Sequence, residues 1–174
     1  MAEDAVKTVL VVDDEQDVRN FLKAALLEAG FNVVTACDGI EALEIIEKQK
    51  PDLISLDLVM PKKSGARLYR DLTKNPKWSQ IPIIIVTGHA QDDLGQADLK
   101  ELTMSGPGIY LEKPVKPDNY VAAVKKILGM DTTAEESILA EKVELQSNVK
   151  NLVDEADPET LRKIKEMLNK KKSS

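Results

Sequence analysis

Five short apolar runs, each followed by a segment with helical periodicity, constrain the fold of this chain more than any other feature of its sequence. The runs lack polar alternation, which is typical of strands buried on both faces of a sheet. Parallel strands joined by helices need right-handed crossovers, and five units are too few for an eight-stranded barrel. The sequence therefore predicts an α/β fold with an open, doubly wound parallel sheet. The expected strands are residues 8–12, 31–36, 53–56, 81–86 and 109–111.

Amphipathic helices are expected after each strand, because apolar residues recur there three and four positions apart. Asp38 with Glu41 resembles a capping box at the start of the second helix. The fourth helix, through Leu94, Leu99 and Leu102, has the weakest pattern and ends in a Gly-Pro-Gly sequence. The first helix is expected to bury the face formed by Val18, Phe21, Leu22, Ala25 and Leu26.

Composition excludes several classes of protein. Lys and Arg total 24 against 30 Asp and Glu, a net charge of -6, so the basic surface that direct nucleic-acid binding needs is absent. The single cysteine, Cys37, allows neither an intrachain disulfide nor a zinc thiolate cluster, and we expect it to be a small buried hydrophobe. The acidic start is unlike a signal peptide, and no apolar stretch approaches about 20 residues. We expect a cytoplasmic protein that contacts neither nucleic acid nor membrane directly.

Polar residues directly follow four of the expected strands. Asp13 and Asp14 end the first, Asp57 the third, Thr87 the fourth and Lys113 the fifth. Each residue alone is typical of a helix cap or a solvated turn. Parallel strands bring these ends to one edge of the sheet, however, and three crowded carboxylates repel one another unless a cation joins them. Oxygen ligands beside an ammonium and a hydroxyl favour Mg²⁺ and a phosphoryl group.

Phosphoryl chemistry at this edge needs an acceptor. The chain has neither a Walker-type loop nor a glycine-rich turn after the first strand, which argues against nucleotide binding. Aspartate can act as a nucleophile toward phosphorus. Asp57, alone at the end of the central strand, is therefore the best candidate for a covalent phosphoacceptor.

Four motifs resemble those of the receiver domain of bacterial two-component response regulators, and the resemblance covers about residues 6–129. Residues 11–15 (VVDDE) resemble the acidic end of that family's first strand, and residues 57–65 (DLVMPKKSG) resemble its phosphoacceptor loop. Residues 86–90 (VTGHA) resemble the hydroxyl-bearing end of its fourth strand, and residues 110–114 (YLEKP) resemble its aromatic residue followed by Lys-Pro.

The resemblance implies a flavodoxin-like sheet with strand order 2-1-3-4-5 and a place in a phosphorelay. Asp57 would accept a phosphoryl group from a sensor histidine kinase or a phosphotransfer protein, and an unknown downstream protein would read the result. No enzyme activity beyond self-phosphorylation and slow self-dephosphorylation is expected. By position, the catalytic residues would be Asp57, Thr87 and Lys113, the Mg²⁺ ligands Asp13 (through water), Asp14, Asp57 and the carbonyl of Val59, and the switch residues Thr87 and Tyr110.

Two positions are expected to tune the lifetime of the phosphorylated state. The resemblance to receivers implies that Val59 and His89, by their positions relative to Asp57 and Thr87, border the path of the attacking water. Valine offers no hydrogen bond, so only His89 could orient or deprotonate that water. The chain has no other histidine and too few nitrogen or sulfur ligands for zinc, which argues against His89 as a metal ligand.

Residues 131–174 differ in composition from the receiver-like residues 1–130, because they contain no glycine and no aromatic residue. Two helices are expected, the first starting at a capping box formed either by Thr132 and Glu135 or by Thr133 and Glu136. The mixed charge of this helical extension argues against a DNA-binding domain.

The first helix of the extension carries a stripe of apolar residues at nearly heptad spacing between residues 138 and 152. Two interpretations stay open: the helix folds back on the receiver-like region, or it forms a homodimer or binds a partner. The stripe consists of Ile138, Leu145, Val149 and Leu152, and a second helix from Asp157-Pro158 carries Leu161, Ile164 and Leu168.

Two functions follow from different features of the sequence. A phosphorylated response regulator that signals by protein contact accounts for the complete polar set at the strand ends. The alternative, a receiver-like scaffold that is never phosphorylated, needs none of those residues. A magnesium-dependent hydrolase with an aspartate nucleophile is disfavoured, because the D-x-D spacing of such enzymes is missing at both acidic sites.

Overall fold

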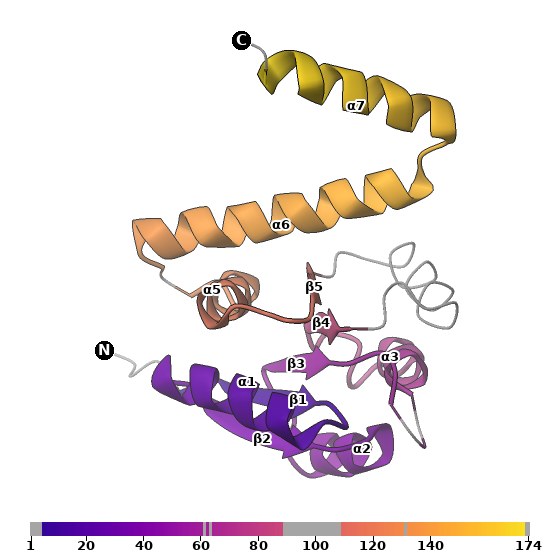
Figure 1. Cartoon of the computed structure of the whole chain (residues 1–174). Coiled ribbons are helices and arrows are strands. Elements are labelled where there is room, and N and C mark those ends of the chain that lie inside the picture. The colour runs from indigo at the N-terminus through magenta and orange to yellow at the C-terminus, as the bar shows by residue number, and fades with distance from the viewer. Residues whose placement is uncertain (1–4, 61, 63, 89–108, 131, 173–174) are drawn as a thin grey trace.

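The computed structural model of the chain describes residues 5–60, 62, 64–88, 109–130 and 132–172 (Figure 1). Five parallel strands form one sheet in the order β2-β1-β3-β4-β5, which confirms the predicted fold and strand order. The predicted fourth helix lies outside the described residues. The strands are β1 (Thr8–Val12), β2 (Asn32–Ala36), β3 (Leu53–Leu56), β4 (Ile83–Thr87) and β5 (Ile109–Glu112).

Helices cover both faces of the sheet, so alternate residues of each central strand enter different cores. Val9 and Val11 of β1 pack with residues of α1 and α5, whereas Leu10 and Val12 pack with residues of α2 and α3. This two-sided burial explains why the strands read as continuous apolar runs. The helices are α1 (Gln16–Glu28), α2 (Gly39–Lys48), α3 (Gly65–Lys74), α5 (Pro117–Ile127), α6 (Ala134–Glu155) and α7 (Pro158–Lys172).

The start of α2 corrects two details of the sequence interpretation. Asp38 caps the helix by accepting hydrogen bonds from the backbone N–H groups of Ile40 and Glu41. Glu41 does not complete a capping box, because its carboxylate accepts from the N–H of Cys37 instead, at 2.7 Å. Cys37 itself is exposed rather than buried, since it follows the last residue of β2 and lies beyond the packed layers.

On α1 the expected buried face is narrower than the periodicity indicates. Leu22 and Leu26 are fully buried, but Phe21 is 45% exposed. The two leucines fill the contact with the sheet and α5, so the phenyl ring at the margin of the apolar stripe faces outward.

The long helix α6 lies across α5 and the outer side of strand β5, at the edge of the sheet (Figure 1). Thr133 and Glu136 form the capping box that starts α6, with both reciprocal hydrogen bonds present. The face of α6 that packs inward consists of small residues: Ala140, Val143 and Ser147 are buried, and Val143 joins the core that contains Val124.

The opposite face of α6 carries the predicted apolar stripe, and it stays exposed. The fold-back interpretation is therefore correct for the packing of α6, but the residues that make the contact are not those of the stripe. Helix α7 turns back after α6 with its own apolar residues partly exposed (Figure 1). Within the described ranges, no helix combines the length and apolar character needed to cross a membrane.

Candidate functional site

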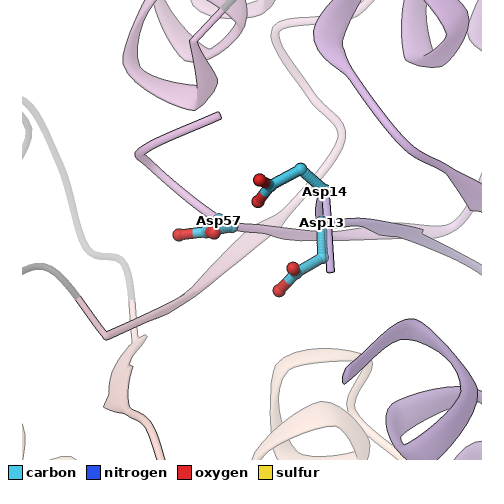
Figure 2. Close-up of side chains that lie close together, drawn as sticks. All are labelled: Asp13, Asp14 and Asp57. Atoms are coloured by element: carbon cyan, nitrogen blue, oxygen red, sulfur yellow. The ribbon is translucent and has the colours of Figure 1, made fainter. Parts of the chain in front are cut away.

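Three aspartates meet at the carboxyl ends of β1 and β3. Asp13 and Asp14 follow β1, and Asp57 follows β3, the neighbouring strand in the sheet. One carboxylate oxygen from each of the three lies within 4.8 Å of the others, and Figure 2 shows the three side chains around a common space. Asp13 is 1% and Asp57 2% exposed, whereas Asp14 is open to solvent. The site is thus an acidic cluster with two buried members and one exposed member.

Backbone hydrogen bonds of the sheet continue past the strands and fix this cluster. The N–H of Asp57 donates to the carbonyl of Val12 at 2.9 Å, and the N–H of Asp13 donates to the carbonyl of Ala36 at 3.2 Å. These bonds extend the parallel ladders by one residue beyond β1 and β3. The backbones of Asp13 and Asp57 are therefore positioned as firmly as residues within the sheet.

The turn after β1 is held by two residues that sequence reasoning did not single out. Arg19 of α1 donates from Nη1 to the carbonyl oxygens of Asp13 and Asp14, at 2.7 and 2.9 Å. The N–H of Glu15 donates to Oδ1 of Asp13 at 3.0 Å. These bonds orient the acidic pair, and no local pattern in the sequence distinguishes Arg19 from other arginines on exposed helix faces.

Lys113, directly after β5, supplies the positive charge of the site. Its Nζ lies 2.7 Å from Asp13, 3.3 Å from Glu15 and 3.4 Å from Asp57. The lysine side chain is only 14% exposed, so its pairs with the buried Asp13 and Asp57 are largely shielded from water, whereas Glu15 is exposed. The predicted residues Asp13, Asp57 and Lys113 are therefore in direct contact, and Glu15 is a further member that the sequence did not single out.

Burial and neighbouring charges have opposite effects on the pKa values of Asp13 and Lys113. Burial raises the pKa of Asp13 above its usual value, although the hydrogen bond from Lys113 works against that rise. Burial acts to lower the pKa of Lys113, but the hydrogen bond to Asp13 and the charge of Asp57 outweigh it, so the pKa is raised. The ammonium therefore keeps its charge at neutral pH and offsets part of the carboxylate repulsion.

Gly65, the first residue of α3, is essential to the geometry of Asp57. A β-carbon at position 65 would stand 1.7 Å from the carbonyl oxygen of Asp57, which no side chain can occupy. The N–H of Gly65 also donates to the carbonyl of Leu58 at 2.9 Å. The glycine at the end of the 57–65 motif thus lets α3 approach the backbone of the candidate phosphoacceptor.

The remaining predicted site residues occupy the same edge of the sheet. Thr87 is fully buried at the end of β4, and its carbonyl accepts from the N–H of Lys113 at 3.1 Å. Val59 donates its N–H to Oδ1 of Asp57 at 3.4 Å. Tyr110 of β5 is buried against Leu58 and its neighbours. His89 lies outside the described residues.

The donor set fits a hard divalent cation. All three side chains offer carboxylate oxygens. Lys113 is the cation that pairs with these carboxylates among the described residues, so the three carboxylates outnumber it. Hard cations prefer oxygen ligands and retain water at open positions. The cluster therefore fits a metal ion of this kind.

The sheet order and the acidic cluster at its carboxyl edge define a doubly wound α/β protein of the receiver type. The response regulator receiver domain family matches residues 9–125. This chain belongs to that family.

Similar proteins include two curated regulators and one solved structure. The phosphate regulon transcriptional regulatory protein PhoB of Pseudomonas aeruginosa is 36% identical over 122 residues, which cover 70% of this chain and 52% of PhoB. The alkaline phosphatase synthesis transcriptional regulatory protein PhoP of Bacillus subtilis is 34% identical over 143 residues, or 82% of this chain and 57% of PhoP. The chain spans about half the length of the curated relatives it matches.

The solved structure is the response regulator TrrA of Thermotoga maritima in complex with Mg²⁺ and BeF, which is 33% identical with a TM-score of 0.57. The match covers 70% of this chain and 99% of TrrA. The match to the receiver family ends at residue 125, before α6 begins. The chain is a signalling receiver domain of two-component systems, with further residues after it.

Proposed function

We propose that Asp57 accepts a phosphoryl group from a phosphohistidine on a sensor histidine kinase or a phosphotransfer protein. The observation that carries this proposal is the buried carboxylate of Asp57 beside Asp13, Asp14 and the Lys113 ammonium. An oxygen of Asp57 forms the new bond to phosphorus as the bond from phosphorus to the histidine nitrogen breaks. In such a transfer the protein mainly positions groups and offsets charge, which these residues can do.

Mg²⁺ is the proposed cofactor, and it supplies positive charge that offsets the phosphoryl oxygens. Asp14, Asp57 and the carbonyl of Val59 would hold it, with Asp13 acting through water. The TrrA structure contains Mg²⁺ with BeF, and this relative at 33% identity supports the choice of metal. Lys113 and Thr87 would bind the phosphoryl oxygens, and Thr87 with Tyr110 would carry the change away from the site.

The direct test is the mass of the intact protein after incubation with acetyl phosphate, with Mg²⁺ or with EDTA. We expect one phosphoryl group on the wild type in Mg²⁺, and none on Asp57→Asn or in EDTA. Asp52→Asn is the matched control, because Asp52 precedes β3 at its opposite end and pairs with Lys7. An adduct that survives Asp57→Asn, or that forms equally in EDTA, would support the scaffold alternative instead.

The proposed output is contact with another protein rather than with DNA. We propose that residues 1–130 form the receiver and residues 131–174 a helical extension without a DNA-binding domain, in a protein of the cytoplasm. The exposed stripe on α6 borders a shallow hollow of about 630 Å³ whose described lining is all from α6. This apolar face supports a homodimer through residues 138–152.

The charges of the two terminal helices support a second copy as the occupant of that face. Helix α6 contains six acidic and two basic residues, and α7 contains two acidic and six basic residues. An antiparallel arrangement of two copies places α7 of one beside α6 of the other, where opposite charges would flank the apolar residues.

A further inference from the structure

The contact between α6 and β5 is centred on one lysine. Nζ of Lys150 lies 2.5 Å from a carboxylate oxygen of Glu112 and 5.3 Å from the centre of the Tyr110 ring. Tyr110 and Glu112 are two residues apart on a strand, so their side chains leave the same face of β5. A single ammonium thus combines an ion pair with a cation–π contact on neighbouring positions of the edge strand.

The other described ion pairs of α6 with the receiver go to α5. Lys125 pairs with Glu136 near the start of α6, and Lys126 pairs with Glu144 in its middle. These pairs hold α6 against α5, which the buried Val143 also does. In the described part of the chain, Lys150 is the residue that ties α6 to β5 by an ion pair.

Both residues that Lys150 contacts are one step away from the proposed phosphoryl site. Glu112 precedes Lys113, whose Nζ reaches Asp13 and Asp57. Tyr110 packs against Leu58, the residue after Asp57. Movement of Tyr110 and Glu112 would therefore move Lys113, whose ammonium would contact a phosphoryl group on Asp57.

We propose that Lys150 is a positioning residue for the phosphoryl site: by holding Glu112 and Tyr110, it fixes the end of β5 from which Lys113 reaches the aspartates, and α6 thereby restrains phosphorylation. This inference rests on the proposed phosphorylation of Asp57, which is the event that would change the contact made by Lys150. Linkage makes the effect reciprocal, so a phosphoryl group on Asp57 weakens the hold of Lys150 on β5. The extension is thus part of the switch rather than an appendage to it.

The first test needs no phosphorylation. Hydrogen exchange of the backbone amides of residues 109–113 is measured in the full-length wild type, Lys150→Gln and Glu112→Gln. Each variant removes one partner of the Lys150–Glu112 ion pair. We expect these amides to exchange at least three times faster in each variant than in the wild type. Lys126→Gln is the matched control, because it removes an ion pair between α5 and α6 and leaves Lys150 in place. Its exchange in β5 should equal that of the wild type.

The second test measures the rate of phosphorylation by acetyl phosphate in Mg²⁺. We expect Lys150→Gln to be phosphorylated about three to ten times faster than the wild type, the range that one partly shielded ion pair with a cation–π contact can supply. Lys150→Arg keeps the charge and the ring contact, so it should restore the wild-type rate. Lys126→Gln should not change the rate, even where it loosens α6.

Each outcome separates this inference from the proposed function. Equal effects of Lys150→Gln and Lys126→Gln would show that docking of α6 as a whole matters, and would overturn a specific role for Lys150. Unchanged exchange in β5 would overturn it as well. If no variant acquires a phosphoryl group, the proposed function fails, and the exchange measurement alone decides whether Lys150 holds β5. If Lys150→Gln fails to fold, Glu112→Gln supplies the same comparison.

Discussion

The ammonium of Lys113 lies closer to Asp13, at 2.7 Å, than to Asp57, at 3.4 Å. In this arrangement the lysine pairs with both buried carboxylates, and its shorter contact is with the acid that flanks the acceptor. A phosphoryl group on Asp57 would draw the ammonium across the cluster, and Asp13 would then depend on the metal for its positive partner.

Lys113→Ala tests this division of roles. Without Mg²⁺ the variant should lose about 3 kcal/mol of unfolding free energy, because a buried carboxylate loses its partner. Addition of Mg²⁺ should raise the unfolding free energy of the variant more than that of the wild type. The variant should also lose the conformational response to phosphorylation. Denaturant titrations with and without Mg²⁺ measure the first two effects. Equal loss of Mg²⁺ binding and of phosphorylation would contradict the assignment of Lys113 to the phosphoryl group.

Asp13→Asn should stabilise the metal-free protein at neutral pH. Burial raises the pKa of Asp13 in the folded protein above its unfolded value of 3.8, so the folded state binds the proton more tightly. The stability this provides is complete below pH 3.8 and is lost as the pH rises through the folded pKa. The gain from Asp13→Asn should therefore grow over that interval and persist at pH 7. Urea unfolding at several pH values in EDTA checks this, and a gain that shrinks as pH rises would contradict it.

Gly65→Ala should destabilise the fold by about 3 kcal/mol or more, since the added methyl group must displace the backbone of Asp57. Gly88→Ala is the matched control beside the same site. A β-carbon there would meet the Lys113 side chain at an ordinary 3.7 Å. Thermal unfolding of both variants measures the difference, and similar small effects would show that α3 can move away from Asp57.

Val59→Asn should speed the loss of the phosphoryl group, because an amide can orient water where valine cannot. The wild type is expected to decay slowly. Decay of the phosphorylated mass after removal of acetyl phosphate measures the rate, with Val34→Asn on β2 as a control for a polar change elsewhere. A fast wild type, or a Val59→Asn variant with unchanged decay, would show that position 59 does not control the lifetime.

Leu145→Ser with Val149→Ser should convert a homodimer to a monomer without releasing α6 from α5. Both side chains are exposed on the outer face of α6, opposite the buried Ala140 and Val143. Light scattering of the full chain measures the molecular mass, and unchanged phosphorylation shows that the receiver is intact. A wild type that is monomeric with and without phosphate would contradict the second copy as partner.

The sheet and the acidic cluster follow from the sequence because strand topology alone brings them together. Parallel strands end at one edge, so polar residues at or directly after the carboxyl ends of β1, β3, β4 and β5 come to the same edge. Arg19, Glu15 and Lys150 could not be found in this way. Their roles depend on how a turn closes or how a distant helix docks, and their sequence surroundings resemble those of ordinary surface charges.

The apolar pattern of α6 did not indicate which face packs on the receiver. Heptad spacing selects the largest side chains, yet the docked face uses Ala140, Val143 and Ser147. Small residues let α6 approach α5 closely. The distance between the two helices depends on how they dock, so the sequence of α6 alone does not reveal that small side chains are needed there. The stripe of larger apolar residues on the other face stays exposed.

Helix α6 also determines how the sheet can meet other chains. Strand β5 is one edge of the sheet, and a strand from another molecule that approached it would meet α6 first. The edge at β2 has no such cover among the described elements, and open edges are where sheets of different molecules join. Edge-to-edge growth needs two open sides on every molecule. With the β5 side covered, association of this kind through β2 stops at a pair of molecules.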